Sequence, residues 1–304
     1  MKTLSILFIA TLLLLPGCTS DEGTVLPTPG FPPVEGDVPL TVESASLEAE
    51  VTSRATPELG AGSQIGVFLA GTGYTAIANR QYNYGSPAWV PNGGAVNTIY
   101  LGGATAQVCA YHPFTSSLTN SAAIPLTSQE YAAAQDISYA TNKDVDGTSS
   151  GKSVSFAMTR AYARIKFTVK RSNYSGKGDV TKLEVSNLLP STTLNITSGA
   201  YAATAGTTAT TVSTTKTVTL AASAASDYAD YLIVPCTPAG AGMTVKLTVD
   251  GQPMTTTLAT AAYTPTAGEW KTINISVQGT EINVTSVTVE EWKTLSSTDI
   301  VPQP

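Results

Sequence analysis

The sequence is poor in the side chains that most enzymes and metal sites use. Its 304 residues include one histidine and three cysteines, and charged residues make up only 12%. The histidine, His112, has no second histidine or cysteine pair at metal-ligand spacing, which excludes the usual zinc sites. A serine or cysteine triad would need this one imidazole, and no nucleophile is arranged around it. We therefore expect a structural His112, no enzyme, no cofactor and no metal site.

Two weaker patterns resemble a glycoside hydrolase site and a calcium site, but neither has the surroundings that such a site needs. The acidic pair Glu290-Glu291 lies beside Trp292 in a terminal strand, where alternate exposure explains it better than glycoside hydrolysis. The segment Asn142–Gly147 partly resembles a calcium loop, but no glutamate follows at the required distance. No glycine-rich phosphate loop is present. Both acidic patterns are interpreted as structural.

Long apolar runs are confined to the N-terminus. There, an apolar run from Leu4 to Leu15 follows Lys2 and is followed by Pro16-Gly17-Cys18. This run is shorter than the ~20 residues that a bilayer-spanning helix needs, so residues 1–18 are predicted to be a secretory signal peptide. A small residue before Cys18 resembles a bacterial lipobox, and lipidation of Cys18 is expected; ordinary signal cleavage nearby is the alternative. The remaining cysteines, Cys109 and Cys236, lie in separate apolar runs and are predicted to be buried free thiols.

Acidic charge is concentrated at the beginning of the chain. Residues 1–54 hold two of the 16 basic and seven of the 22 acidic residues, which leaves 14 basic and 15 acidic residues and a net charge of −1. A nearly neutral body lacks the basic face that nucleic acids and anionic membrane surfaces require, so neither is an expected partner.

The rest of the chain has the pattern of an all-β protein. Runs with period-two alternation are separated by Gly, Pro and Asn turns, and only Ser128–Ala134 could form a short helical turn. We predict two Greek-key or transthyretin-like β-sandwich domains in tandem, with at most short helices. The division is 19–54 for a proline-rich spacer and removable leader strand, 55–175 for the N-terminal domain and 176–304 for the C-terminal domain.

The segment from Val38 to Arg54 has an unusual alternation. Val38, Leu40 and Val42 share one phase, whereas Leu47 and Val51 share the opposite phase, with the change at Ser44–Ser46. A strand that crosses between the two sheets of a sandwich would produce such a change. We expect this segment to be a strand that precedes the main body.

Several separate stretches together resemble the Bacteroidota fimbrillins, the type V pilins whose filaments form by donor-strand exchange. The stretches are the lipobox at Cys18, the acidic leader ending at Arg54-Ala55, Ile65-Gly66-Val67-Phe68, Ala110-Tyr111-His112-Pro113, Asp136 to Ala140, Ala161 to Phe167, Leu232-Ile233-Val234-Pro235, Ala267-Gly268-Glu269-Trp270 and Glu291-Trp292.

The resemblance implies a structural subunit of a surface pilus that reaches the cell surface as an outer membrane lipoprotein. An arginine-specific protease would cut between Arg54 and Ala55 and release the leader strand with Val38, Leu40, Val42, Leu47 and Val51. The C-terminal strand of another pilus subunit would then fill the vacated groove in a head-to-tail polymer that supports adhesion. Carried over to this sequence, the donor residues are Ile282, Val284, Val287, Val289, Trp292, Leu295 and Ile300. Shaft and tip subunits both fit this pattern.

A surface lipoprotein that binds glycans is the alternative. Tyr74, Tyr82, Tyr84 and Trp89 could form an aromatic platform for sugar rings, although packing in the core or at an edge of a sandwich is the preferred interpretation.

Overall fold

The computed structural model describes residues 37–47, 59–148, 152–203, 208–222, 224–235, 242–259 and 264–291. Within these ranges the chain is almost entirely β, and the helical structure consists of two 3-10 turns, η1 (Gly94–Asn97) and η2 (Ala133–Gln135). The all-β prediction is confirmed. The expected helical turn at Ser128–Ala134 is limited to η2. None of the helices in the described ranges has the length and apolarity needed to cross a membrane.

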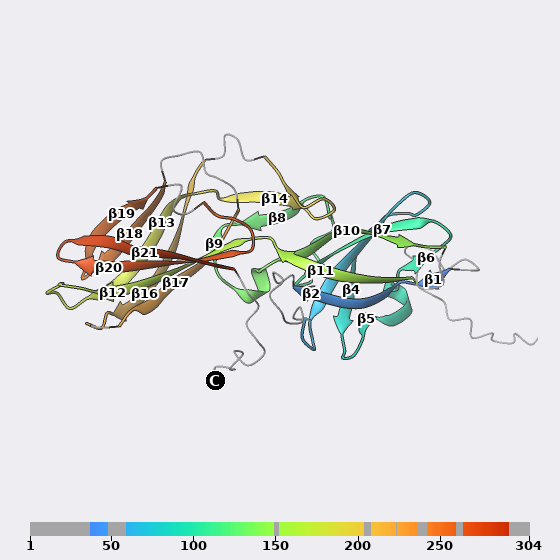
Figure 1. Ribbon diagram of the computed structural model, residues 1–304, viewed down its shortest axis with the longest axis horizontal. Helices are drawn as coiled ribbons and strands as arrows, with labels where there is room; N and C mark the ends of the chain where they lie inside the picture. Colours follow the sequence, from blue (N-terminus) through green and yellow to red (C-terminus); the bar gives the residue numbers. More distant parts are fainter. Residues whose placement is uncertain are drawn as a thin grey trace, which may run out of the picture.

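The first half of the chain forms a seven-stranded sheet in the order β2-β11-β10-β7-β3-β4-β5. Its strands are β2 (Thr41–Leu47), β3 (Gln64–Ala70), β4 (Ile77–Tyr84), β5 (Trp89–Pro91), β7 (Thr105–His112), β10 (Ser138–Asp146) and β11 (Ser153–Arg160). The sheet curls until its two edge strands, β2 and β5, come into contact. A small ladder of β1 (Val38–Pro39) with β6 (Tyr100–Leu101) closes one end (Figure 1).

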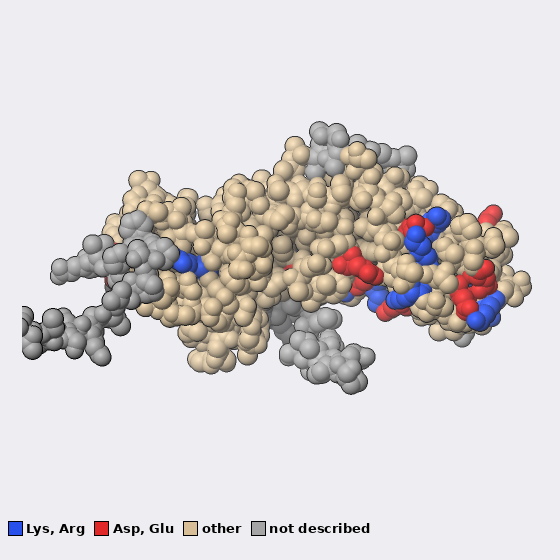
Figure 2. Space-filling model, turned by 180° about the vertical axis from the view of Figure 1, so that it is seen from behind, with Lys and Arg blue, Asp and Glu red and all other residues tan. Residues whose placement is uncertain are grey.

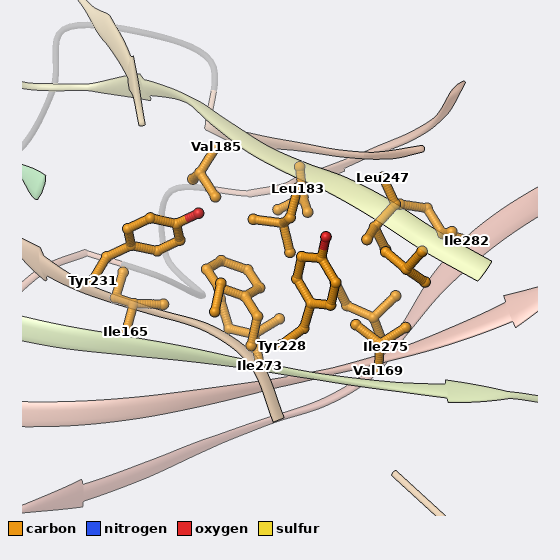
Figure 3. Close-up of a cluster of buried hydrophobic side chains, with 14 of the residues drawn as sticks. Ile165, Val169, Leu183, Val185, Tyr228, Tyr231, Leu247, Ile273, Ile275 and Ile282 are labelled. Atoms are coloured by element: carbon orange, nitrogen blue, oxygen red, sulfur yellow. The ribbon is translucent and has the colours of Figure 1, made fainter. Parts of the chain in front are cut away.

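The second half forms a sandwich of two sheets. One has the order β21-β20-β12-β17-β9 and the other β16-β13-β18-β19. These strands are β9 (Gln129–Glu130), β12 (Ala163–Arg171), β13 (Asp179–Leu188), β16 (Thr210–Thr219), β17 (Ser226–Ile233), β18 (Met243–Val249), β19 (Gln252–Leu258), β20 (Glu269–Gln278) and β21 (Glu281–Glu291). Alternate residues of both sheets point inward, as the period-two pattern predicts, and fill the core in Figure 3.

Two strands lie in a different domain from the one that the sequence-based division gives them. A boundary at residue 175 assigns β9 and β12 to the N-terminal domain, but β9 is hydrogen bonded to β17, and β12 to β17 and β20, of the second sandwich. The chain changes sheets between the end of β11 at Arg160 and the start of β12 at Ala163. Alternation alone reports that a strand exists, not which sheet it joins, so the crossing is not visible in the sequence.

A third core joins the two halves. A three-stranded sheet, β15-β14-β8, pairs β8 (Ile124–Thr127) from the first half with β14 (Ser191–Asn195) and β15 (Ala200–Tyr201) from the second. Buried side chains from both halves meet there: Phe68, Cys109, Tyr111, Ile124, Leu126, Tyr139, Ala161, Tyr162, Leu189, Leu194, Ile196, Leu232 and Val234. Because this core is apolar and shared, we expect the two halves to unfold together.

Replacement of Leu194 by Ala tests the joining core. Leu194 is fully buried, so the substitution should lower the free energy of unfolding by about 2–5 kcal/mol, whereas the exposed control Ser191→Ala should change it by less than about 0.5 kcal/mol. Urea unfolding followed by fluorescence measures both. Two separate transitions in the wild-type protein would contradict a shared core.

Candidate functional site

The strand that contains Val38–Leu47, here called the leader strand, forms one edge of the N-terminal sheet. Its β1 part pairs antiparallel with β6, and its β2 part pairs parallel with β11. Further backbone bonds join the Leu40 amide to the Ile99 carbonyl at 2.7 Å and the Thr41 amide to the Lys152 carbonyl at 2.8 Å. As an edge strand, β2 is hydrogen bonded within the sheet to β11 alone. Its removal would leave the backbone groups of β11 unpaired on that side.

The leader strand also supplies side chains to the N-terminal core. Leu40, Val42, Ala45 and Leu47 are 4%, 2%, 1% and 8% exposed, respectively. They belong to the same buried cluster as the side chains that line the strand's binding groove, namely Ile99, Leu101, Val154, Phe156 and Met158. We call the surface formed by β6, β11 and these five side chains the leader groove. Burial of a large aliphatic side chain contributes about 1.5–3 kcal/mol, so the strand is an integral part of this core.

A β-bulge causes the phase change in the leader strand. Val42 pairs with Val154 and Ser44 pairs with Ser155, so Glu43 is an extra residue in β2. After the extra residue, odd-numbered instead of even-numbered side chains point to the core. Ala45 and Leu47 therefore face the same core as Leu40 and Val42. The phase change itself is not a crossing between sheets, because Thr41–Leu47 pairs with β11 on both sides of it; the strand changes partner earlier, at Leu40, from β6 to β11.

Lys152 lies at the end of the leader groove where β11 begins. Its side chain is 6% exposed, and its Nζ donates a 2.6 Å hydrogen bond to the Leu101 carbonyl. The backbone carbonyl of Lys152 accepts a hydrogen bond from the Thr41 amide. This bonding ties β6 to the start of β11 beside the leader strand.

The predicted leader residues are only partly within the described ranges. Leu40, Val42 and Leu47 are buried as expected, whereas Val38 is 36% exposed and packs on β6 at the surface. The sequence-based prediction missed Ala45, because a small side chain next to a phase change carries little signal. Cys18, Val51, Arg54 and Ala55 lie outside the described residues.

The predicted donor residues begin inside the second sandwich. Ile282 is 3% exposed and lies beside Leu247 and Ile275 in the core (Figure 3). Val284 and Val287 are half-buried against this core, and Val289 is 55% exposed. These residues belong to β21, an edge strand that pairs antiparallel with β20. Trp292, Leu295 and Ile300 lie outside the described residues.

Other candidate residues have structural surroundings. His112 donates a 2.9 Å hydrogen bond from Nδ1 to the Gln64 carbonyl, and burial lowers its pKa below the usual value, which keeps it neutral. Burial raises the pKa of the Cys109 thiol to about 12, so this thiol stays protonated and unreactive. Cys236 lies outside the described residues. The segment Asn142–Asp146 is part of β10, and no group of His, Cys, Asp or Glu that could hold a metal occurs in the described ranges.

The aromatic residues considered for sugar binding belong largely to the core. Tyr82 and Trp89 are 1% and 6% exposed, and Trp89 packs against the half-buried Tyr84 with ring centroids 5.2 Å apart and ring planes tilted by 39°. Burial raises the pKa of Tyr82 to about 12. Core or edge packing, the preferred interpretation, accounts for Tyr82 and Trp89, while the half-buried Tyr74 donates a 2.6 Å hydrogen bond from its hydroxyl to the Ala104 carbonyl.

Comparisons with known proteins agree with this architecture. The family model described as fimbrillin-like matches residues 53–292, a range that begins just before Arg54. No curated protein matches the chain. Among solved structures, a candidate cell adhesion protein from Bacteroides uniformis is 21% identical, with a TM-score of 0.60, 85% of this chain covered and 100% of that one. Another from Bacteroides ovatus is 18% identical, with a TM-score of 0.64 and coverages of 86% and 99%. Both similarities show that this chain has the same fold as these two proteins.

Truncation of a buried leader side chain tests the contribution of this strand to the core. Leu40→Ala should lower the free energy of unfolding of the full-length protein by about 2–5 kcal/mol, because it leaves a cavity between β6 and β11. The neighbouring exposed Thr41→Ala should have an effect below about 0.5 kcal/mol. Equal effects of the two substitutions in urea unfolding would show that the strand is only loosely attached.

Proposed function

Because this chain belongs to the fimbrillin-like family, as the match over residues 53–292 shows, we propose that it is a fimbrial subunit that polymerises by donor-strand exchange. In this proposal the precursor is exported with a lipid on Cys18, which holds it at the outer membrane. An arginine-specific protease cleaves after Arg54 and releases the leader strand. The subunit then joins a surface fimbria that supports adhesion. It is a structural protein and not an enzyme.

The position of the leader strand carries this proposal. The strand precedes Arg54 in sequence, pairs along the edge of β11 and buries four side chains in the N-terminal core. Cleavage after Arg54 would therefore remove a whole edge strand and leave the rest of the sandwich covalently intact. An open groove of apolar side chains and unpaired backbone groups binds an added strand, because the strand restores both burial and the ladder.

The distribution of arginines supports cleavage at this residue. The sequence has five arginines, and the other four are Arg80, Arg160, Arg164 and Arg171. These four lie within β4, β11 and β12. A protease needs an extended chain that it can accommodate, and residues in a paired strand become available only after local unfolding. Arg54 is the one remaining arginine, and it lies outside the described residues.

Filament growth follows from the geometry of the exchange. The groove is in the N-terminal domain, and the proposed donor is the C-terminal part of the next subunit from Ile282 onward. Such a contact uses two different surfaces, so it does not close on itself and repeats into a filament. Cleavage also removes the acidic leader, and the net charge falls from −6 to −1, which reduces repulsion between subunits.

The surface charge is consistent with protein partners and not with a polyanion. On the face shown in Figure 2, charged side chains gather over the C-terminal sandwich and occur as mixed acidic and basic pairs. The N-terminal sandwich is nearly free of charge on this face. The face in view shows no basic stripe of the kind that nucleic acid binding requires.

Replacement of Arg54 by Ala tests the cleavage step. Cells that carry Arg54→Ala should accumulate the full-length lipidated protein, with acylated Cys18 at its N-terminus and no filaments. The control Arg80→Ala, which changes an arginine inside β4, should be processed to an N-terminal Ala55 and should polymerise. N-terminal sequencing and electron microscopy report the two steps. Normal filaments from Arg54→Ala cells would disprove cleavage-dependent assembly, and acylated Cys18 alone in wild-type cells would favour the glycan-binding lipoprotein.

A further inference from the structure

Two strands at opposite ends of the chain share the same spacing of apolar residues. In the leader strand the core residues are Leu40, Val42, Ala45 and Leu47, with intervals of two, three and two. In β21 the corresponding residues are Ile282, Val284, Val287 and Val289, with the same intervals. An ordinary strand has a constant interval of two, so a matching interruption in both strands is a specific similarity.

The interruption has the same structural cause in both strands. In the leader strand the bulged residue is Glu43, three residues after Leu40. In β21, Val284 pairs with Ile275 and Ser286 pairs with Asn274, so the extra residue is Thr285, three residues after Ile282. When the two strands are aligned in the same direction, Thr285 falls on Glu43. In the reversed alignment the four apolar positions also coincide, but Ser286 falls on Glu43 and the bulges no longer match.

The exposure of β21 in its own sheet differs from that of the leader strand. Val289 is 55% exposed, and Val284 and Val287 are half-buried, whereas the leader residues at the same positions are at most 8% exposed. Three of the four side chains would thus become more buried in the leader groove than they are in their own sheet. Against this gain, Ile282 would leave the second core, and one ladder, that with β20, would be broken.

We propose a register for this exchange: the donor strand β21 enters the leader groove of the next subunit in the direction of the leader strand, with Ile282 at the position of Leu40. Val284, Val287 and Val289 then occupy the positions of Val42, Ala45 and Leu47, and Thr285 takes the bulged position of Glu43. This inference rests on the proposed function and deepens it. The bulge makes the groove selective, because a regular strand would turn half of its apolar side chains to solvent.

A lysine at Val289 tests the register. Val289→Lys should leave the folded monomer unchanged, because this side chain is largely exposed in its own sheet. In the groove the ammonium group would take the buried place of Leu47 without a partner, so filament yield after protease treatment should fall by more than about tenfold. The control Asn283→Lys is exposed in β21, and Thr41, whose position it would take, is also exposed. This control should polymerise like the wild-type protein.

The outcomes distinguish a wrong β21 register from a wrong proposed function. Filaments of Val289→Lys at wild-type yield would overturn the β21 register and place the donor elsewhere, while donor-strand assembly would stand. A loss of filaments with both Val289→Lys and Asn283→Lys would also overturn this register, because the register predicts that only Val289→Lys prevents polymerisation. Failure of the cleaved wild-type protein to polymerise would instead count against the proposed function itself. Circular dichroism melting of each monomer checks that the variants fold.

Inter-subunit disulfides test the direction of the strand. Val154 is the partner of Val42 on β11, so Val154→Cys combined with Val284→Cys should give disulfide-linked oligomers in oxidised filaments. The matched control combines Val154→Cys with Val287→Cys, which pair only if the strand is reversed. Preferential linkage in the control would overturn the proposed direction, and linkage in neither filament would remove β21 from the groove.

Discussion

The hydrogen-bonded edge between β2 and β11 is the interaction on which the N-terminal domain depends. On one side of this edge lies a strand that buries Leu40, Val42, Ala45 and Leu47, and on the other lies the remainder of the core. Because this strand is the first of the described strands and pairs at an edge, it can be removed without breaking any other of them. Few positions in a β domain combine a large share of the core with this freedom to leave.

In the proposed exchange, the bulge at Glu43 would make this edge selective for a strand with a matching bulge. It keeps four side chains on one face in spite of the odd spacing, and β21 has a bulge at the equivalent residue, Thr285. The two strands experience different environments, since one is buried in the N-terminal core and the other is half-exposed at the edge of the second sandwich. A difference in burial between two sites that accept the same strand is a driving force for exchange. The shared core around Leu194 would keep the two domains of each subunit in a fixed relation along a filament.

Sequence patterns predict those features of this fold that are local. Alternation identifies the all-β class and the buried Leu40, Val42 and Leu47. Partners in a sheet are not local, so the sequence misplaces β12 and presents the bulge at Glu43 as a crossing. For the same reason Ile282 is predicted as a donor residue with no sign that it also fills the second core. Ala45 is missed because its small side chain gives no signal of burial.

Electron microscopy of the purified full-length protein, before and after treatment with an arginine-specific protease, tests the central claim most directly. The account predicts monomers before treatment, because the leader strand fills its own groove. After treatment it predicts filaments whose subunits begin at Ala55. Filaments in the untreated sample would contradict the account. A cleaved protein that stays monomeric after losing residues 1–54 would contradict it as well.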